Sequence, residues 1–281
     1  MNLIKTKRAK LKVKRTFLKK GACSHTFFYI LNREFGHARE YEERAVDPLA
    51  GGIVQQGYQC GIIWGACMAL GTEAYHRNSN LDKTIGTTIK ATQHMIKSFV
   101  DRAKCIDCEE ITNCNWSNKW SIAKYFFSGK FYGCFKLAEK WAPDAIQAAH
   151  EALALDQSDL PQQSVSCASE VVKRMGGTDE EAAMVAGFAG GLGLSGNGCG
   201  ALAAAIWKII LELVKKDSWK YTMSDPVTEG IINKFYETTD YKMECHEICG
   251  KKFNSIEEHS EFIKNGGCEK LINVLSQLEA N

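Results

Sequence analysis

The sequence predicts an all-α fold, an internally duplicated helical bundle in which glycine-rich turns lead into buried helices. Apolar side chains recur at helical spacing in most segments, whereas few segments alternate apolar and polar residues as strands do. The 281 residues include only 4 prolines, which favours helices joined by few irregular loops. The same order of glycines and cysteines also occurs twice along the chain, which indicates two copies of one structural unit.

The repeat is centred on a glycine-rich turn that runs into a cysteine. The sequence AGGIVQQGYQCG at positions 50–61 matches AGGLGLSGNGCG at positions 189–200, so that Cys60 corresponds to Cys199. Three further pairs of cysteines match at similar shifts along the chain: Cys23 with Cys167, Cys108 with Cys245, and Cys134 with Cys268. We therefore predict a basic N-terminal arm at 1–22, a first cysteine module at 23–155 and a second cysteine module at 156–281.

In the first module the spacing of apolar residues predicts where the helices lie. Phe27, Ile30 and Leu31 share one face of a helix predicted for residues 20–45. The next helix, 62–75, is apolar and carries small residues that let a neighbouring helix approach closely. Further helical segments are predicted at 87–100, 120–141 and 143–155, with polar loops at 76–86 and 105–117.

The second module repeats this order. Thr178 followed by Glu181 forms a capping signal, which predicts that a helix begins there and continues through residue 188. After the glycine-rich turn, residues 201–214 form the most apolar helix of the chain. The remaining helices are predicted at 165–175, 226–236 and 269–278, with one more from residue 255, and 156–163 joins the modules.

Composition narrows the classes of function. The net charge is +2, which gives no sign of a nucleic-acid-binding protein, and we interpret the nine basic residues among the first twenty as a solvated arm. This segment lacks the apolar core of a secretory signal, and no stretch reaches the ~18 apolar residues of a membrane span. We therefore expect a cytoplasmic protein. In a reducing compartment, recurring cysteines bind metal or carry out redox chemistry more often than they form structural disulfides.

The position of the cysteine after the glycine-rich turn suggests how it works. The amides in the first turn of a helix have no partner within the helix and carry partial positive charge. A cysteine there is stabilised as a thiolate, and its pKa falls below ~8.5. Glycines add unhindered N–H groups that can point at sulfur or at an anion. The glycines predicted to contact a cofactor are Gly51, Gly52, Gly57, Gly190, Gly191, Gly196 and Gly198.

Four thiolates gathered from four helix ends would complete an iron–sulfur site, since such clusters take four cysteine ligands. The duplicated chain would then hold up to one cluster in each half. The predicted ligands are Cys23, Cys60, Cys108 and Cys134 in the first half, and Cys167, Cys199, Cys245 and Cys268 in the second. His25 and His246 are near these cysteines in sequence, and we interpret them as hydrogen-bonding or surface residues. Cys67 is expected to pack in the core, and Cys105, Cys114 and Cys249 have no predicted role.

Three other cofactors are disfavoured. The run Gly191-x-Gly193-x-x-Gly196 matches the dinucleotide fingerprint, but that fingerprint follows a strand and here the preceding stretch is helical. Cys105-x-x-Cys108 has a spacing common in zinc sites, yet the repeated cysteines are far apart in sequence, unlike paired zinc knuckles. Covalent haem attachment is not expected, because the chain has no Cys-x-x-Cys-His.

Two alternatives to an electron-transfer protein stay open. One is a thiol–disulfide oxidoreductase, with Cys60 and Cys199 as attacking thiols of low pKa and Cys23 or Cys167 resolving the mixed disulfide. The other is a non-catalytic helical interaction protein whose cysteines are structural or bind zinc. Whether the chain is an enzyme, and whether it forms a homo-oligomer, is not decided by the sequence.

At these residues the sequence resembles the C-GCAxxG-C-C family of redox-active proteins. That family is a small helical module with one early cysteine, a glycine-rich turn running into Cys-Gly-Ala, and two late cysteines. Two modules in tandem would cover roughly residues 20–281. The second keeps Cys199-Gly200-Ala201, whereas the first has Ile62 after Gly61. The resemblance implies redox chemistry, anaerobic metabolism and a redox partner protein that the sequence does not identify.

Overall fold

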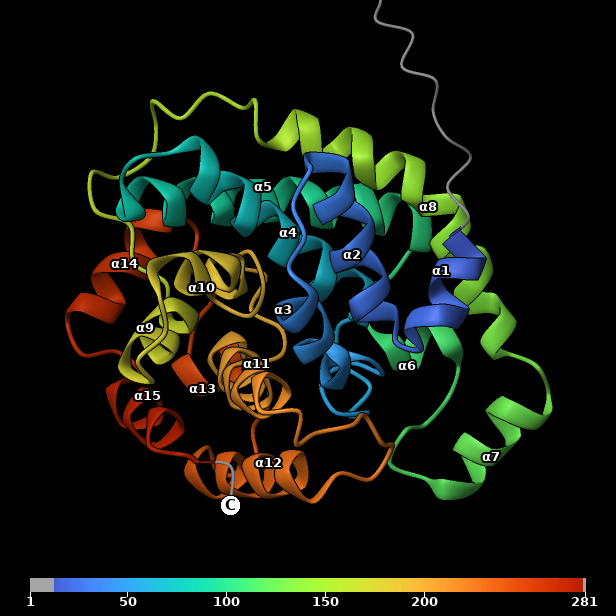
Figure 1. Cartoon of the computed structure of the whole chain (residues 1–281). Coiled ribbons are helices and arrows are strands. Elements are labelled where there is room, and N and C mark those ends of the chain that lie inside the picture. The colour runs from blue at the N-terminus through green and yellow to red at the C-terminus, as the bar shows by residue number, and fades with distance from the viewer. Residues whose placement is uncertain (1–12, 280–281) are drawn as a thin grey trace, which may run out of the picture.

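The computed structural model describes residues 13–279, and within that range the chain forms 15 α-helices and 2 short 3-10 helices (Figure 1). The only extended pairings among the described residues are two isolated bridges, Gln59 with Asp107 and Gly198 with Glu244. The prediction of an all-α, internally duplicated fold is confirmed.

Helix α1 (Val13–Lys20) precedes the repeat, and each half then contributes the same eight elements in the same order. The first half comprises α2 (Cys23–Phe35), α3 (Glu40–Ala45), η1 (Asp47–Leu49), α4 (Gly61–Arg77), α5 (Leu81–Ala103), α6 (Cys108–Thr112), α7 (Lys119–Phe127) and α8 (Phe131–Ala152). The second comprises α9 (Cys167–Arg174), α10 (Asp179–Met184), η2 (Ala186–Phe188), α11 (Gly200–Lys215), α12 (Pro226–Thr238), α13 (Cys245–Cys249), α14 (Ile256–Lys264) and α15 (Glu269–Ser276).

The first residues of these helices are related by the same shifts in residue number as the repeated cysteines. The shift that carries Cys60 onto Cys199 also carries the starts of α3 and α4 onto those of α10 and α11. The shift that carries Cys108 onto Cys245 likewise carries the starts of α6 and α7 onto those of α13 and α14. We use the term sister helices for such pairs, and sister positions for residues related by these shifts.

The glycine-rich turn has the same unusual backbone in both halves. Residues 51–55 and 57 have φ angles from 50° to 86°, and residues 190–194 and 196 have φ angles from 58° to 81°. Glycine adopts this left-handed conformation readily, but for Ile53, Val54 and Gln55 it costs roughly 1–2 kcal/mol per residue. The strain persists because the surroundings hold the turn, in which Ile53 is fully buried.

The two halves share one hydrophobic core. Helix α4 packs on α10 of the other half, and α11 packs on α3. Because these are sister helices, the contact is reciprocal, as across a two-fold axis. The ring of Trp64 on α4 meets that of Phe188 edge to face, with 4.6 Å between centroids. Both α4 and α11 lie at the centre of the molecule (Figure 1). The module boundaries at 22 and 155 stay a prediction, since packing continues across the joint.

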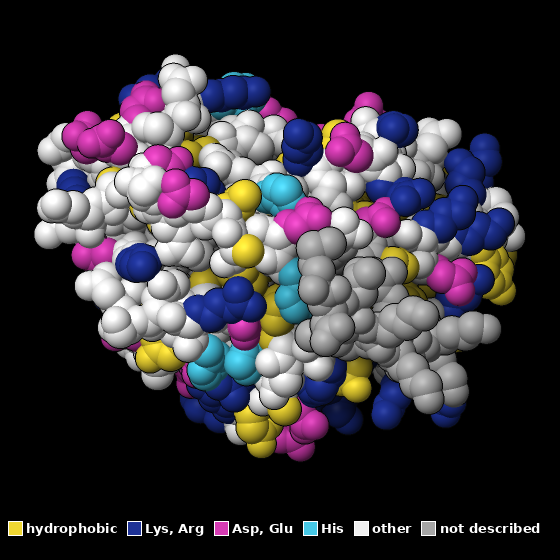
Figure 2. Space-filling view, turned by 90° about the horizontal axis from the view of Figure 1, so that it is seen from above, with side chains coloured by type: hydrophobic (Ala, Val, Ile, Leu, Met, Phe, Trp, Pro, Cys, Tyr) yellow, Lys and Arg dark blue, Asp and Glu magenta, His cyan; other side chains and the backbone are white. Residues whose placement is uncertain are grey.

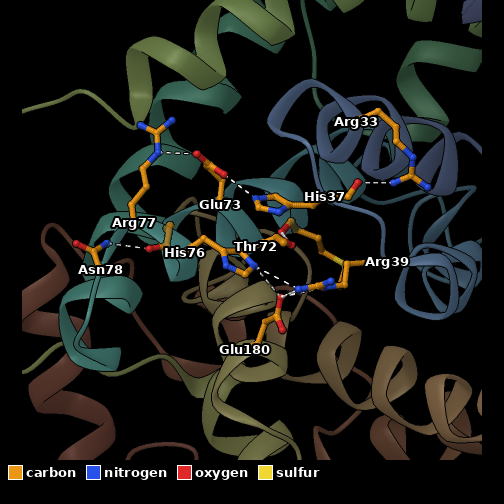
Figure 3. Close-up of polar contacts among 11 residues, drawn as sticks. Arg33, His37, Arg39, Thr72, Glu73, His76, Arg77, Asn78 and Glu180 are labelled. Atoms are coloured by element: carbon orange, nitrogen blue, oxygen red, sulfur yellow. Dashed lines mark hydrogen bonds and ion pairs between the residues drawn. The ribbon is translucent and has the colours of Figure 1, made fainter.

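A polar network on the surface also joins the halves (Figure 3). Arg39 of the first half forms an ion pair with Glu180 of the second, at 2.6 Å between Nη2 and Oε1. Beside it, Nε2 of His37 lies 2.7 Å from Oε2 of Glu73. The ring of His37 also stacks on that of His76, 4.4 Å between centroids. The network fixes the segment between α2 and α3 against α4 and α10.

Several predicted boundaries were wrong. The helix predicted for 20–45 ends at Phe35, because Gly36 takes the left-handed conformation and caps it. The segment 120–141 is divided between α7 and α8 by a turn at Gly129, whose φ is 71°. Pro143 lies inside α8 instead of opening a new helix. The predicted loop 105–117 contains the short helix α6.

No helix among residues 13–279 has both the length and the apolar composition that a transmembrane segment needs.

Candidate functional site

The four cysteines predicted for the first half line one cavity of about 340 Å³. Each comes from the beginning of a helix. Cys23 and Cys108 are the first residues of α2 and α6, Cys60 immediately precedes α4, and Cys134 is in the first turn of α8. We call this set the first centre. The rest of the cavity wall is mostly apolar and aromatic, which keeps the thiols away from bulk water.

A short backbone bridge holds the second and third cysteines of each half together. In both halves the N–H group of each of these cysteines donates to a carbonyl beside the other cysteine. The bonds are Cys60 N to Ile106 O (2.8 Å) and Cys108 N to Tyr58 O (2.7 Å), and Cys199 N to Met243 O (3.0 Å) and Cys245 N to Asn197 O (2.7 Å). Cysteines that are far apart in sequence therefore become neighbours by main-chain pairing.

Two of the seven predicted glycines direct backbone N–H groups at sulfur. The pKa of Cys23 is lowered by a hydrogen bond from the Cys60 thiol, and then by the N–H groups of Gly51 and Ser24, against the effect of burial. In the second half, burial raises the pKa of Cys167 to about 12, while the N–H group of Gly190 acts in the opposite direction. Gly51 and Gly190 are sister positions, so the same contact between a glycine N–H group and a cysteine sulfur occurs in both halves.

The other five predicted glycines shape the turn. A Cβ on Gly191 would lie 2.9 Å from the Cβ of Cys245, so this glycine lets the turn approach α13. A Cβ on Gly57 would lie 2.8 Å from Glu109 Oε2, and one on Gly198 would lie 2.5 Å from Gln59 Oε1. Gly52 and Gly196 have φ angles of 78° and 81°. Both angles are in the left-handed region that glycine adopts readily, and the predicted contact of these five glycines with a cofactor stays a prediction.

The expectation that Cys60 and Cys199 are thiols of low pKa was wrong. The thiol of Cys60 donates a hydrogen bond to Cys23 and is buried, and both effects raise its pKa. Burial raises the pKa of Cys199, and the neighbouring thiol of Cys167 adds to this. Burial thus outweighs the helix amides at both positions. In the first centre the thiol that most readily ionises is Cys23, which the hydrogen bond from Cys60 stabilises.

The predicted cysteines of the second half also converge, but they enclose almost no space. Cys167, Cys199, Cys245 and Cys268 line a cavity of about 10 Å³, and Cys249 lies among them. Sγ of Cys249 is 3.8 Å from Sγ of Cys245 and 3.5 Å from Sγ of Cys268. We call these five residues the second centre. Three of its sulfurs are thus in contact through Cys249, and the cavity that the centre lines is far smaller than that of the first centre.

The two centres differ in how well they suit an iron–sulfur cluster. The cavity of the first centre has room for a cluster, and its four thiols come from the residue type that binds one. The second centre has room for one ion at most, and a single tetrahedral ion with metal–sulfur bonds of ~2.3 Å sets its thiolates ~3.8 Å apart. Among residues 13–279, no three Cys, His, Asp or Glu side chains are already arranged around a metal position.

An aromatic pair covers each centre, and sequence analysis missed it. Trp116 and Tyr125 line the first cavity, with 5.3 Å between centroids and 58° between ring planes. At the sister positions, Phe253 and Phe262 line the second cavity, with 5.1 Å and 54°. The shift that relates Cys108 to Cys245 would have revealed both pairs.

The hydroxyl of Tyr125 distinguishes the first centre. Its oxygen lies 3.1 Å from Sγ of Cys134. Burial raises the pKa of Tyr125, so the phenol stays protonated and can donate to a Cys134 thiolate. Burial also raises the pKa of Cys134, to about 11, and the tyrosine acts against that. The sister residue Phe262 has no hydroxyl.

The remaining cysteines and histidines have other surroundings. Cys67 is fully buried in the shared core, as predicted. Cys105 is partly exposed, and Cys114 is buried, with the Ser121 hydroxyl 3.7 Å from its sulfur. Nδ1 of His25 lies 3.0 Å from Oδ1 of Asp47, and Nδ1 of His246 lies 2.9 Å from the carbonyl oxygen of Gly196. Both histidines are thus engaged in hydrogen bonds, as predicted.

One comparison with known proteins gave a match. A family model described as "Putative redox-active protein (C_GCAxxG_C_C)" matches the chain twice, at residues 22–144 and 163–279. Each match contains the four repeated cysteines of its half. Neither the curated proteins nor the solved structures that were searched gave a match.

Proposed function

The chain belongs to the C-GCAxxG-C-C family of redox-active proteins, in two tandem copies, and we propose that it transfers electrons through an iron–sulfur cluster held by the first centre. One observation carries the proposal, namely that four thiols from the beginnings of four helices line one cavity of about 340 Å³. Cys23, Cys60, Cys108 and Cys134 are the proposed ligands.

The surrounding residues prepare these thiols for such a role. The N–H group of Gly51 and the thiol of Cys60 stabilise Cys23 as a thiolate. The Tyr125 hydroxyl is placed to donate to Cys134. A bound cluster would take up and release one electron at a time. Hydrogen bonds to its sulfur ligands raise its reduction potential, so the Gly51 N–H group and the Tyr125 hydroxyl favour the reduced state, whereas Cys60 loses its thiol proton when it binds the cluster.

For the second half we retain the sister residues Cys167, Cys199, Cys245 and Cys268 as proposed metal ligands, for a single ion and not for a cluster, because the cavity that they line holds only about 10 Å³. The sulfur contacts at 3.5 and 3.8 Å favour a different activity there, reversible dithiol–disulfide exchange. In that reaction Cys249 and Cys268 form one S–S bond while an organic disulfide takes up two electrons and two protons to give two thiols. For this exchange we propose Cys249 and Cys268 in place of the attacking thiol Cys199 and the resolving thiol Cys167.

The partner that receives or supplies electrons is proposed to be another protein. A reducing cytoplasm and anaerobic metabolism remain part of the proposal, since exposed clusters are sensitive to oxygen.

Anaerobic reconstitution with iron and sulfide, followed by iron analysis and visible absorption spectra, tests the proposal. We expect the full chain to bind iron and to show a charge-transfer band that bleaches on reduction. Cys108→Ser should lower the iron content, whereas Cys67→Ser, which changes a buried cysteine outside both centres, should retain it. Cys245→Ser reports on the second centre separately.

A colourless, iron-free protein after reconstitution would refute the cluster in the first centre. Thiol titration before and after treatment with an organic disulfide then tests the exchange reaction. The loss of two thiols, prevented by Cys249→Ser, would support a Cys249–Cys268 couple.

A further inference from the structure

Exposed aromatic side chains gather around the mouth of the first cavity. Eight large hydrophobic side chains are exposed among the described residues, and six of them come from α1, α7, the start of α8 and the segment before α12. They are Leu18, Trp120, Phe126, Phe127, Tyr132 and Met223. Of these, Leu18, Phe126 and Met223 also line the cavity. Trp120 and Phe127 are 85% and 93% exposed, so they protrude almost completely into solvent.

The sister helix shows that the repeat does not require this surface. Helix α14 exposes Glu257, Glu261 and Lys264 at the positions where α7 exposes Trp120, Lys124 and Phe127. Helix α14 buries Ile256 and Ile263 against the second centre, as an ordinary amphipathic helix does. At the corresponding positions α7 has Lys119 and Phe126, both exposed. The first half thus has large apolar side chains where the same fold elsewhere has charge.

Basic side chains accompany the aromatic ones. Residues 119–140 contain five lysines, no arginine and a single acidic residue, Glu139, while residues 13–20 contain four basic residues and no acidic one. These two segments together carry a charge of +8 (9 − 1) in a chain whose net charge is +2. Glu139 is itself paired with Lys14, at 2.8 Å. Seen from above, Lys and Arg side chains gather on the side of the molecule that holds α1 and α8 (Figure 2).

We propose that this surface, formed by α7, α1 and the start of α8, docks the protein on an anionic lipid bilayer at the level of the headgroups. Trp, Tyr and Phe rings placed among lysines are the composition of segments that lie in the membrane interface. Lysine is depleted at protein–protein interfaces, where arginine is enriched, so eight lysines against one arginine, Arg15, favour lipid over an acidic protein partner. Helix α7 also projects at the edge of the molecule, where its side chains can reach a flat surface (Figure 1).

The surface adjoins the first cavity, because Leu18, Phe126 and Met223 belong to both, whereas the anchors Trp120 and Phe127 do not line the cavity. The inference depends on the exposed surface alone and does not require a cluster in the first centre. Its outcome is therefore separate from that of the proposed function.

Co-sedimentation of the full chain with vesicles tests the proposal. We expect binding to vesicles that contain phosphatidylglycerol and little binding to vesicles of phosphatidylcholine alone. Binding should weaken as salt rises from ~0.01 M to ~0.5 M, because the Debye length shortens. The double variant W120E/F127K installs the residues of the sister helix without changing the net charge. It should lower partitioning at least ~10-fold, since both apolar anchors are lost.

Y241K is the matched control, since Tyr241 is 79% exposed but lies in the second half. It should bind as the unchanged protein does, and circular dichroism should show that both variants are folded. Equal binding of W120E/F127K and the unchanged protein would overturn the proposal. So would failure of the unchanged protein to sediment with anionic vesicles at low salt, which would assign the surface to an acidic protein partner.

Discussion

Gly61→Ala is expected to disturb the first centre directly. Gly61 begins α4 immediately after Cys60, and a Cβ there would lie 2.6 Å from Sγ of Cys23. Ordinary contact begins at 3.4 Å, so the sulfur would have to move by about 0.8 Å (3.4 − 2.6). Rotation of the cysteine does not suffice, because the same Cβ would lie 2.9 Å from Cα of Ala50 and 3.1 Å from the carbonyl oxygen of Leu49. The glycine-rich turn would therefore have to shift away from the helix.

The magnitude follows from two opposing effects. Overpacking of a well-packed site costs about 1–3 kcal/mol, and alanine in place of glycine in a helix returns roughly 0.5–1 kcal/mol. We expect a net loss of about 1–2 kcal/mol in the free energy of unfolding. For a chain of this size that lowers Tm by about 2–6 °C. The pKa of Cys23 should also rise toward that of an ordinary thiol, since the hydrogen bond from Cys60 is weakened.

Urea denaturation followed by circular dichroism measures the stability, and iron content after anaerobic reconstitution measures the site. Gly230→Ala is the matched control, because a Cβ at Gly230, inside α12, meets nothing within 4 Å. That variant should be about 0.5–1 kcal/mol more stable than the unchanged protein. If Gly61→Ala proved as stable as Gly230→Ala and kept its iron, the close approach of Cys23 to α4 would be wrong.

Three further predictions concern other parts of the chain. Tyr125→Phe removes the hydroxyl beside Cys134 and should lower the reduction potential of a cluster in the first centre. An unchanged potential in voltammetry would show that the phenol does not donate to Cys134. Glu181→Gln leaves the buried Lys208 with one fewer anionic partner and should cost about 1–3 kcal/mol at pH 7. Burial alone would raise the pKa of Glu181, but hydrogen bonds from lysines hold it below its ordinary value of 4.5. The difference in unfolding free energy between Glu181→Gln and the unchanged protein should therefore shrink as the pH falls below that value. Denaturation curves that show the same difference at every pH would contradict the ion pair. Gly193→Val should lower the free energy of unfolding by at least about 1–2 kcal/mol, since Gly193 has a φ of 58° and a Cβ there would lie 3.0 Å from Ile96. An unchanged Tm would argue against the strained turn.

Much of the architecture could be predicted because cysteine and glycine mark element boundaries. Cys23 and Cys167 open helices within three residues of the predicted starts at 20 and 165, and the capping box at Thr178 and Glu181 forms as expected. Pro143 misled the prediction, because a long helix packed along its length tolerates one missing hydrogen bond. The left-handed turn was also beyond reach, since Ile53 and its neighbours do not ordinarily adopt positive φ.

The cysteines of the candidate site could be predicted from the sequence, but the size of the cavity that they line could not. The eight repeated cysteines gave no sign that one centre would enclose about 340 Å³ and the other about 10 Å³. Cys249 was missed because its sister position is Thr112, so it lies outside the repeat. The effect of burial on Cys60 and Cys199 depends on packing that spacing alone does not reveal.

The reciprocal packing of α4 on α10 and of α11 on α3 has a consequence for how such a chain arose. Each half covers the other with the same face, which is the arrangement that two identical subunits adopt in a symmetric pair. A polypeptide with a single copy of this unit would leave that face bare, and joining to a twin would cover it. Because both copies belong to one chain, the face stays covered, and the sulfur chemistry of one half can differ from that of the other.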